Sequence, residues 1–305
     1  MSDITLRTMV PGDWRDVAEL IYLSTNYWYE THGRQAIFRG GAEVALVFCE
    51  EYEALDPGCC VLAESHGRIV GSCFYHPRPS HFSLGIMNAH PNYFGRGVAR
   101  QLLRFITDKA DTAELPVRLV SSALNLDSYA LYTRVGFTPR VLYQDMVLPA
   151  TGPGRCVEGM ERVRDATLGD LAAIVALEGE LQQLHREKDY RHFLANATGI
   201  WRVSVYENTQ GAIDGVLASV AHPGSTMLGP GVARTEDQAL ALILAELDHH
   251  RGQSPVFLVP ATCSSLVARL YALGARNCEL HVHQIRGTYT PGTGILMPSF
   301  LPETA

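Results

Sequence analysis

Two periods of apolar residues alternate along this chain and predict both strands and helices. Apolar runs at 60–63 and 68–75, joined by the turn sequence Ser65-His66-Gly67, predict a β-hairpin, and 82–89 predicts a third strand. Residues 98–110 instead place apolar side chains at helical spacing, which predicts a helix with one apolar face packed on a sheet. The pattern therefore indicates a fold that contains both helices and strands, of the α/β (α+β) class.

The other elements expected in the first half are short and again alternate between strand and helix. Residues 24–58 are the exception, because their pattern is helical but irregular. From the N-terminus on, the short elements are expected at 4–8 (strand), 11–13 (helix cap), 117–121 (strand), 127–136 (helix, capped by Asp127 and ended by Gly136) and 141–147 (strand).

Three short segments recur in the second half of the chain in the same order. Such self-similarity indicates a repeated unit. We interpret it as two copies of one domain, residues 1–150 and 151–305, joined near Thr151-Gly152-Pro153-Gly154. The echoes pair 7–13 with 164–170, 95–100 with 229–234 and 135–137 with 273–275, at offsets of 157, 134 and 138 residues.

Composition and charge exclude several classes of protein. The 305 residues are 47% apolar and 19% charged, with a net charge of -7 and no basic run, so a nucleic-acid partner is not expected. No apolar stretch is long enough to span a membrane, and the N-terminus does not resemble a signal peptide. The seven cysteines form no disulfide or zinc pattern, which favours the cytoplasm and no metal. The oligomeric state is left open.

A glycine-containing loop joins the third predicted strand to the long helix. Gly95 and Gly97 lack side chains that would keep a ligand from the backbone, and the first N–H groups of a helix attract anions. Arg96 and Arg100 add positive charge beside them. The loop therefore predicts a pyrophosphate cradle, with a tight strand-to-helix turn as the alternative.

This loop resembles motif A of the GNAT superfamily of acyl-CoA N-acyltransferases, Q/R-x-x-G-x-G/A. Gly97 and Ala99 fill the G and G/A positions, Ala89-His90-Pro91 matches the preceding triplet, and Phe94 stands where Gln or Arg is usual. The resemblance implies two GNAT-like domains, each a mixed, mostly antiparallel central sheet flanked by helices. It implies that acetyl-CoA is held by Phe94, Gly95, Arg96, Gly97, Val98, Ala99 and Arg100.

A second motif follows at the distance that the family shows. Asn125, Ser128, Tyr132 and Gly136-Phe137 match the family's motif B, N-x-x-A/S-x-x-x-Y-x-x-x-G-F. The resemblance implies that Asn125 contacts the pantetheine arm of the cofactor and that Tyr132 protonates the departing thiolate. It also implies that backbone N–H groups at Met87, Asn88 and Ala89 stabilise the oxyanion. The alternative for Tyr132 is a half-buried helix aromatic.

No residue is evident as the base that takes a proton from the acceptor amine. Many members of the family carry a Glu five residues before the Asn, whereas this chain has Val120. The candidates that remain open are His81, Ser83, His90 and a chain of water molecules.

The second copy is expected to keep the fold and to lose the chemistry. Its counterpart of the glycine loop, Gly229-Pro230-Gly231, places a proline where a phosphate-binding N–H could stand. Cys263 falls at the Asn position, and Leu270, or Tyr271 after a one-residue slip, falls at the Tyr position. We expect a degenerate GNAT-like domain with an acceptor-site or structural role.

Two other segments have alternative interpretations. His281-Val282-His283 puts two imidazoles on one strand face, where a metal site is a weaker alternative because no third ligand is evident. The aromatic-rich segment 27–38 either covers the acceptor at the junction of the two copies or packs into the core.

The sequence thus predicts an acetyl-CoA-dependent N-acetyltransferase that passes acetyl directly to the primary amine of a small molecule. The alternatives are an acyl-CoA-binding sensor without transfer activity and an acetyltransferase of protein N-termini or lysines. Phe94 and the missing Glu keep the sensor open.

Overall fold

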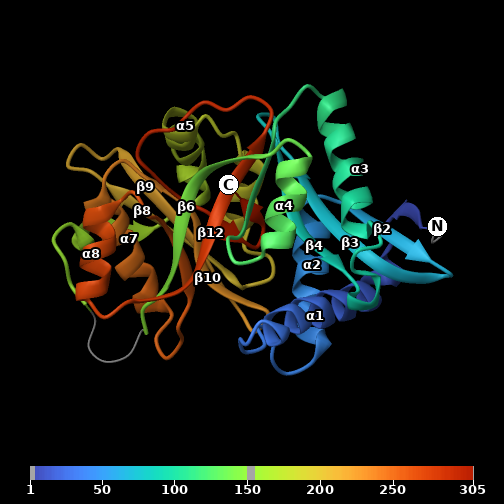
Figure 1. Ribbon diagram of the computed structural model, residues 1–305. Helices are drawn as coiled ribbons and strands as arrows, with labels where there is room; N and C mark the ends of the chain where they lie inside the picture. Colours follow the sequence, from blue (N-terminus) through green and yellow to red (C-terminus); the bar gives the residue numbers. More distant parts are fainter. Residues whose placement is uncertain (1–3, 150–154, 305) are drawn as a thin grey trace.

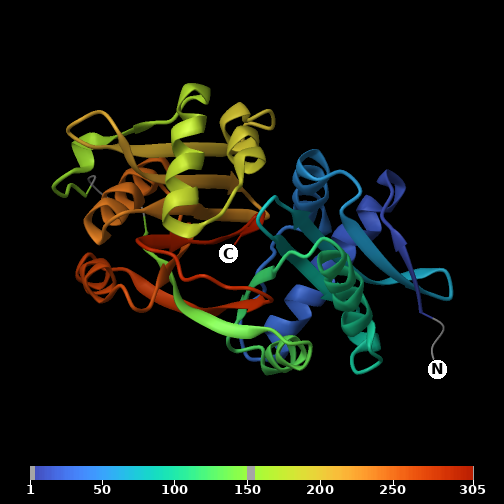
Figure 2. The ribbon, with the colours of Figure 1, turned by 90° about the horizontal axis from the view of Figure 1, so that it is seen from above.

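The fold is built on one sheet that runs through both halves of the chain (Figures 1 and 2). A computed structural model describes residues 4–149 and 155–304, so the expected junction at Thr151-Gly152-Pro153-Gly154 lies outside the described residues. The helices are α1 (Trp14–Thr31), α2 (Leu46–Leu55), α3 (Val98–Thr112), α4 (Leu126–Arg134), α5 (Leu171–Gln182), α6 (Glu187–Ala195), α7 (Glu236–His249) and α8 (Ser264–Ala272). The strands are β1 (Thr5–Thr8), β2 (Cys60–Ser65), β3 (Arg68–Pro77), β4 (Phe82–Ala89), β5 (Val117–Ser122), β6 (Thr138–Val147), β7 (Val163–Asp165), β8 (Trp201–Glu207), β9 (Ile213–His222), β10 (Ser225–Ala233), β11 (Val256–Pro260), β12 (Arg276–Arg286), β13 (Ile295–Met297), β14 (Ser299–Phe300) and β15 (Glu303–Thr304).

The two halves exchange their last long strands. The strand order is β1-β2-β3-β4-β5-β12-β6-β11-β10-β9-β8-β7, so β12 of the second half is inserted between β5 and β6 of the first. His281 of β12 lies opposite both Ser122 of β5 and Tyr143 of β6. Figure 2 shows β6, in light green, running beside the orange-red β12 between the two halves. Each half therefore completes its sheet with a strand from the other half. Among the described strand pairs, β4–β5 and β10–β11 are parallel and the others are antiparallel.

Helices cover both faces of the sheet. We call the face covered by α1, α2, α5 and α6 the α1 face; its core includes Ile21 and Leu177. On the opposite face, the α3 face, α3 packs over the first half through Leu102, and α7 and α8 pack over the second half through Ile243 and Leu266. The expected architecture, a mostly antiparallel mixed sheet flanked by helices in each half, is confirmed.

The last described segment of the chain crosses the α1 face. β14 and β15 form a short antiparallel pair, and the Tyr52 hydroxyl of α2 donates a hydrogen bond to the Phe300 carbonyl at 3.0 Å. Beyond it, β15 lies against both β4 and β5. The end of the second half therefore covers part of the first.

Buried ion pairs also join the two halves. Arg78 of the first half contacts Asp56 at 2.9 Å and Asp189, which lies on α6 of the second half, at 2.5 Å. Lys188, also on α6, contacts Asp56 at 2.8 Å. Arg78, Asp56 and Asp189 are nearly inaccessible to solvent, so breaking one of their contacts would leave a buried charge uncompensated.

The first and third sequence echoes correspond to equivalent structures. Arg7 contacts Asp13 at 2.6 Å and Arg164 contacts Asp170 at 2.9 Å, in each case just before the first helix of its half. Gly136 and Gly274 both adopt positive φ, +96° and +95°, after α4 and α8. The two halves are thus built from one plan.

The second sequence echo, 95–100 with 229–234, does not correspond to equivalent structures. Gly229-Pro230-Gly231 is not a loop but lies inside the buried strand β10, where Gly231 pairs with both Leu217 and Met297. The helix that follows begins after only Arg234 and Thr235. These glycines lie among apolar residues, in a segment that forms a buried strand. The irregular pairing between Leu228 and Gly231 is a β-bulge.

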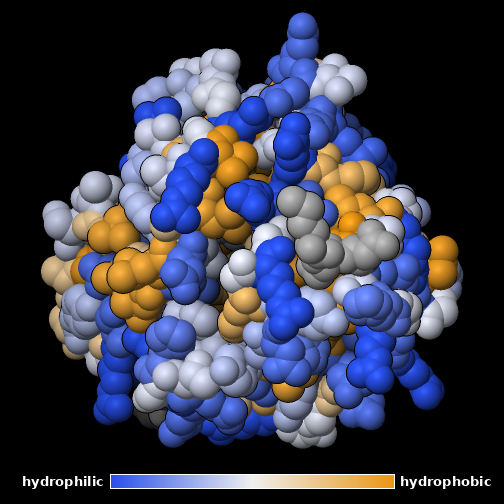
Figure 3. Space-filling view, turned by 45° about the vertical axis from the view of Figure 1, so that its right-hand side comes forward, coloured by the Kyte–Doolittle hydropathy of each residue, from blue (hydrophilic) through white to orange (hydrophobic). Residues whose placement is uncertain are grey.

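None of the helices in the described ranges is both long and apolar enough to cross a bilayer. On the face shown in Figure 3, apolar side chains form separate patches with polar and charged residues between them.

Candidate active site

The glycine loop leads into α3 with its backbone donors unused. Gly95 and Gly97 adopt left-handed φ angles of +75° and +83°, and Gly97 is the residue from which α3 begins. Within the described chain, no hydrogen-bond acceptor faces the N–H groups of Gly95, Gly97, Val98, Ala99 and Arg100. The N–H groups of Phe94 and Arg96 are occupied, by the carbonyls of Pro91 and Tyr93. The loop can therefore offer five donors to an anion.

The side chains around this cradle lie at its rim. Arg96 and Arg100 are exposed, and the Arg96 guanidinium stacks over the Tyr93 ring at 5.0 Å. Phe94, 49% exposed, packs edge-on against Tyr27 of α1 with the ring centroids 6.1 Å apart. The departure from the family motif at Phe94 thus extends an aromatic contact to α1 and leaves the backbone donors untouched.

Strands β4 and β5 separate just below the cradle. They pair only at Phe82 with Val117 and at Ser83 with Arg118. A bulge between Leu84 and Met87 then bends β4. Gly85 sits in this bulge, and a Cβ there would lie 2.8 Å from the Phe74 carbonyl oxygen, too close for any other residue without a shift. The result is an opening between the two strands.

Met87, Asn88 and Ala89 line this opening. They pair with β3 on one edge, so their other edge faces the space toward β5. The Asn88 amide donates to Ser24 Oγ at 2.8 Å and to Thr25 Oγ1 at 3.2 Å, which fastens the end of β4 to α1. The bulge was not predicted, although a glycine within an apolar strand is the signal that indicates one.

Motif B forms the far wall of the opening. Asn125 caps α4, because its Oδ1 accepts a hydrogen bond from the Ser128 N–H at 3.0 Å. The prediction that Asp127 is the capping residue is therefore wrong. Tyr132 is 7% exposed, and its ring lies 5.8 Å from that of Phe137 in the core of the α3 face. The cradle follows β4 and motif B follows β5, so both lie at the carboxyl ends of these two parallel strands.

The exchanged strand β12 brings a polar cluster to the α1 face beside this opening. His283 lies opposite Val120, where the family's Glu would stand, and His281 lies opposite Ser122. His281 Nδ1 is 2.7 Å from the Asp145 carboxylate of β6, without hydrogen-bond alignment. Burial raises the pKa of Asp145 although His281 is close.

Glu279 of β12 completes this cluster. Its carboxylate accepts hydrogen bonds from Ser122 Oγ and, at 2.9 Å, from the Tyr29 hydroxyl of α1. Arg34 donates to the Cys278 carbonyl at 3.0 Å, while Phe38 is buried in the core. Part of the aromatic-rich segment thus contacts the second half and part packs inward, while its covering of the acceptor stays a prediction.

The sequence singled out His281 and His283 only as a possible metal pair, because nothing local shows that residues some 160 positions further along will lie beside β5. The base candidates that it proposed have other partners. His81 is buried and hydrogen-bonded to Ser80 and Ser83, and burial followed by the charge of Arg118 holds its pKa well below the usual range. His90 accepts a hydrogen bond from the Asn92 N–H. His281 and His283 share one face of β12, but no group of three metal-ligating side chains occurs in the described ranges.

In the described part of the second half, the residues at the corresponding positions differ. The first turn of α7 is closed by a capping box, in which Thr235 Oγ1 accepts from the Gln238 N–H and Gln238 reaches back to Thr235. With Gly274 equivalent to Gly136, the fully buried Leu270 takes the place of Tyr132. Tyr271 points away and donates to Gln144 at 2.6 Å.

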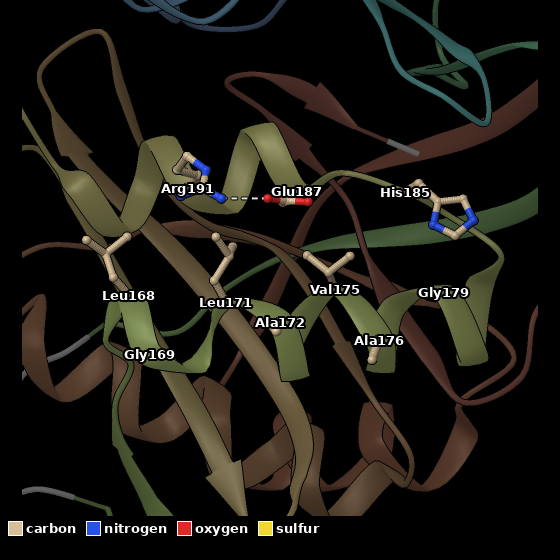
Figure 4. Close-up of a pocket in the computed structure, with 10 residues that line it drawn as sticks. All are labelled: Leu168, Gly169, Leu171, Ala172, Val175, Ala176, Gly179, His185, Glu187 and Arg191. Carbon is tan, nitrogen blue, oxygen red and sulfur yellow. Dashed lines mark hydrogen bonds and ion pairs between the residues drawn. The ribbon is translucent and has the colours of Figure 1, made fainter.

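A groove of about 660 Å³ lies instead between α5 and α6 of the second half. Figure 4 shows Leu171 and Val175 of α5 directed into it and the Glu187–Arg191 ion pair of α6 at its edge. Its lining is mostly apolar, and it contains none of the residues of the site described above.

Two segments of the chain match models of acetyltransferases. Residues 18–137 match the acetyltransferase (GNAT) family, and residues 181–291 match the acetyltransferase (GNAT) domain. The chain belongs to the GNAT superfamily. It is a tandem GNAT protein and an acyltransferase of that superfamily.

Solved structures show the same tandem fold. One from Pyrococcus horikoshii, assigned to the acetyltransferases, aligns over 100% of this chain and 97% of its own with a TM-score of 0.78 at 15% identity. A tandem GNAT protein from the clavulanic acid biosynthesis pathway aligns over 94% of this chain and 100% of its own, with a TM-score of 0.62 at 15% identity. At these identities, the likeness concerns the fold.

One relative is similar in sequence over a short segment. The UPF0157 protein YqkA of Bacillus subtilis (strain 168) is 29% identical over 72 residues. The match spans 24% of this chain and about a fifth of the length of YqkA.

Proposed function

We propose that the first domain of this tandem GNAT protein transfers acetyl from acetyl-CoA directly to the primary amine of a small molecule. The observation that supports this most is that three parts lie together at the carboxyl ends of β4 and β5. They are five unused backbone donors, the opening after Gly85, and Asn125 with Tyr132. The seven cysteines, all thiols, favour the cytoplasm.

The cradle and the opening position the reactants. N–H groups from Gly95 to Arg100 hold the pyrophosphate, and the pantetheine arm passes Asn125, whose Oδ1 is used in capping α4. Backbone N–H groups on the open edge of Met87–Ala89 donate to the carbonyl oxygen, where negative charge develops as the amine attacks. The nitrogen–carbon bond forms as the carbon–sulfur bond breaks, and Tyr132 supplies the proton to the leaving thiolate.

His281 is the candidate that takes the proton from the attacking amine. It faces the α1 face beside the opening, and the carboxylate of Asp145 stabilises the imidazolium that forms. His283 is the poorer base, because burial and the charge of Arg118 keep its pKa well below the usual value. The base of the first domain would then come from the second half of the chain.

Tyr29, Arg34 and Glu279 limit the space on the acceptor side. They connect α1 and the loop after it to β12, so the α1 face beside the opening is already enclosed by side chains. This supports a small acceptor over a folded protein. Release of CoA thiol from acetyl-CoA against a broad amine panel tests the proposal; tight CoA binding without turnover on any amine would favour the sensor.

Gly97→Asp is expected to lower the affinity for acetyl-CoA at least about tenfold, because its carboxylate would stand at the pyrophosphate position. Gly97→Asn is the matched control, since Asn tolerates the left-handed backbone as Asp does but carries no charge. Titration calorimetry of both variants would separate charge from backbone strain.

The same titration tests whether the second half binds the cofactor. We expect one acetyl-CoA per chain and no change in affinity for Thr235→Asp, which keeps the α7 cap. Two equivalent sites, or weaker binding in Thr235→Asp, would contradict the placement of the cofactor in the first half.

His281→Gln is expected to reduce kcat/KM most at low pH and little at high pH. Without the base, only the neutral fraction of the amine reacts, and an amine of pKa about 8 is roughly one-tenth neutral at pH 7. The expected loss at pH 7 is therefore about tenfold, recovering above the amine's own pKa. A loss that does not change with pH would exclude His281 as the proton acceptor.

A further inference from the structure

Arg118 of β5 is a buried arginine without a counter-ion. It is 9% exposed, its Nε is buried without a hydrogen-bond partner, and no carboxylate of the described residues lies within ion-pair distance of its guanidinium. The other two buried arginines are neutralised: Arg78 by Asp56 and Asp189, and Arg186 by Glu178. Buried charges without partners are costly, so they indicate a ligand or a functional constraint.

Arg118 lies where the opening begins, on the acceptor side. It is in the last pair of residues, with Ser83, before β4 and β5 separate. Its neighbours Val117 and Leu119 point into the core of the α3 face, so Arg118, like Val120, points to the α1 face. The guanidinium is therefore on the same face as His281 and at the apex of the space proposed for the thioester.

The charged groups that act on Arg118 are the guanidinium of Arg186 and, with a smaller effect, the carboxylate of Glu178. Burial and then the charge of Arg186 lower the pKa of Arg118 to about 10, which leaves it protonated at neutral pH. His283 is neutral, as its lowered pKa indicates, and its Nε2 is buried without a partner.

The carboxylate of this region, that of Glu178, already accepts hydrogen bonds from other residues. Both oxygens of Glu178 are bound, by Arg186 and by the Tyr190 hydroxyl. Arg186 Nη1 is itself buried and unpartnered. The region thus holds one positive charge in excess and several unused polar atoms.

We propose that Arg118 binds a carboxylate of the acceptor, so that the substrate is an amino acid or a similar small amine that carries a carboxylate. A planar guanidinium binds a carboxylate through two parallel hydrogen bonds, which fixes orientation as well as position. With the carboxylate on Arg118, the amine at the other end of a short chain lies along the opening toward the thioester. This inference rests on the proposed function and names its substrate class.

Matched pairs of acceptors test this directly. The full chain is assayed by thiol release with glycine, β-alanine and γ-aminobutyrate and with the primary amide of each, which keeps the amine and removes the charge. We expect the wild type to prefer at least one acid over its amide about tenfold or more in kcat/KM. Arg118→Gln is expected to raise KM for that acid, to change kcat little and to abolish the preference. Arg118→Lys is expected to restore part of it, and it serves as the test variant if Arg118→Gln does not fold.

A binding measurement separates the inference from the proposed function. We expect the preferred acid to raise the Tm of the wild type and not that of Arg118→Gln. Equal turnover of every acid and its amide would overturn the inference and leave the acetyltransferase standing. No turnover on any amine, with the Tm shift present, would overturn the proposed function alone.

One intrachain rival needs its own control. β15 lies against β4 and β5 and includes Glu303, so a carboxylate of the chain itself is the alternative occupant. Glu303→Gln is expected to leave the acid preference and the Tm shift unchanged. If Glu303→Gln lowers Tm as much as Arg118→Gln does, and no acid raises Tm in the wild type, Arg118 is a structural ion-pair residue and the inference fails.

Discussion

A chain that ends at residue 149 is expected to bind no acetyl-CoA and to remain unfolded, although it contains both GNAT motifs. Two domains joined near Gly152, as the sequence predicts, would instead allow the first to fold and bind the cofactor alone. The structure gives a reason against this, because β12 occupies the position between β5 and β6. Without the second half, β5 loses β12 along its full length, and β6 loses both of its partners, β12 and β11. A domain's net stability is only about 5–15 kcal/mol, so we expect that it does not survive the loss of a central strand.

The measurement is circular dichroism and CoA titration of the fragment, and the control is to supply the missing strand. Residues 1–149 and 155–305, produced together as separate chains, are expected to assemble and to regain CoA binding, because β6 and β12 pair without a covalent link between them. A folded 1–149 fragment with normal CoA affinity would show that the exchanged strand is dispensable.

Tyr132→Phe is expected to lower kcat by about 10²–10⁴-fold with little change in the KM for acetyl-CoA, because proton transfer to the thiolate occurs only in the transition state. The ring is buried against Phe137, and Phe preserves that packing, so the variant should keep its Tm. Steady-state kinetics and a melting curve measure both.

Tyr129→Phe is the matched control for this change. Tyr129 lies one turn earlier on α4 and is only partly buried, so its variant is expected to retain full activity. A loss below about threefold in Tyr132→Phe would mean that water or the acceptor protonates the thiolate.

Local signals in the sequence predicted the cofactor side of the site. Gly95 and Gly97 were singled out because a helix follows them directly, and the structure gives both the left-handed backbone that such a loop requires. The repeated Arg7 and Asp13 pairing, found again at Arg164 and Asp170, revealed the tandem organisation because an ion pair and a helix start recur together. The cofactor contacts themselves stay predictions.

Non-local signals were invisible in the sequence. Gly229-Pro230-Gly231 looks like a loop by composition, and only its pairing with β9 and β13 shows that it is a strand. The same reasoning explains the missing base. Nothing near Val120 indicates that His281 and His283 will lie beside β5, because that depends on which half provides the next strand.

The exchange of β6 and β12 also sets when the first domain can form during synthesis. Val117 of β5 pairs with Arg286, so one edge of β5 has no neighbour until the ribosome has added almost the whole second half. At about 5–20 residues per second, that interval is on the order of ten seconds or longer. Throughout it, β5 is an open strand edge able to pair with other chains. Shortening this interval, or covering the edge with a chaperone during it, is therefore expected to raise the yield of folded protein.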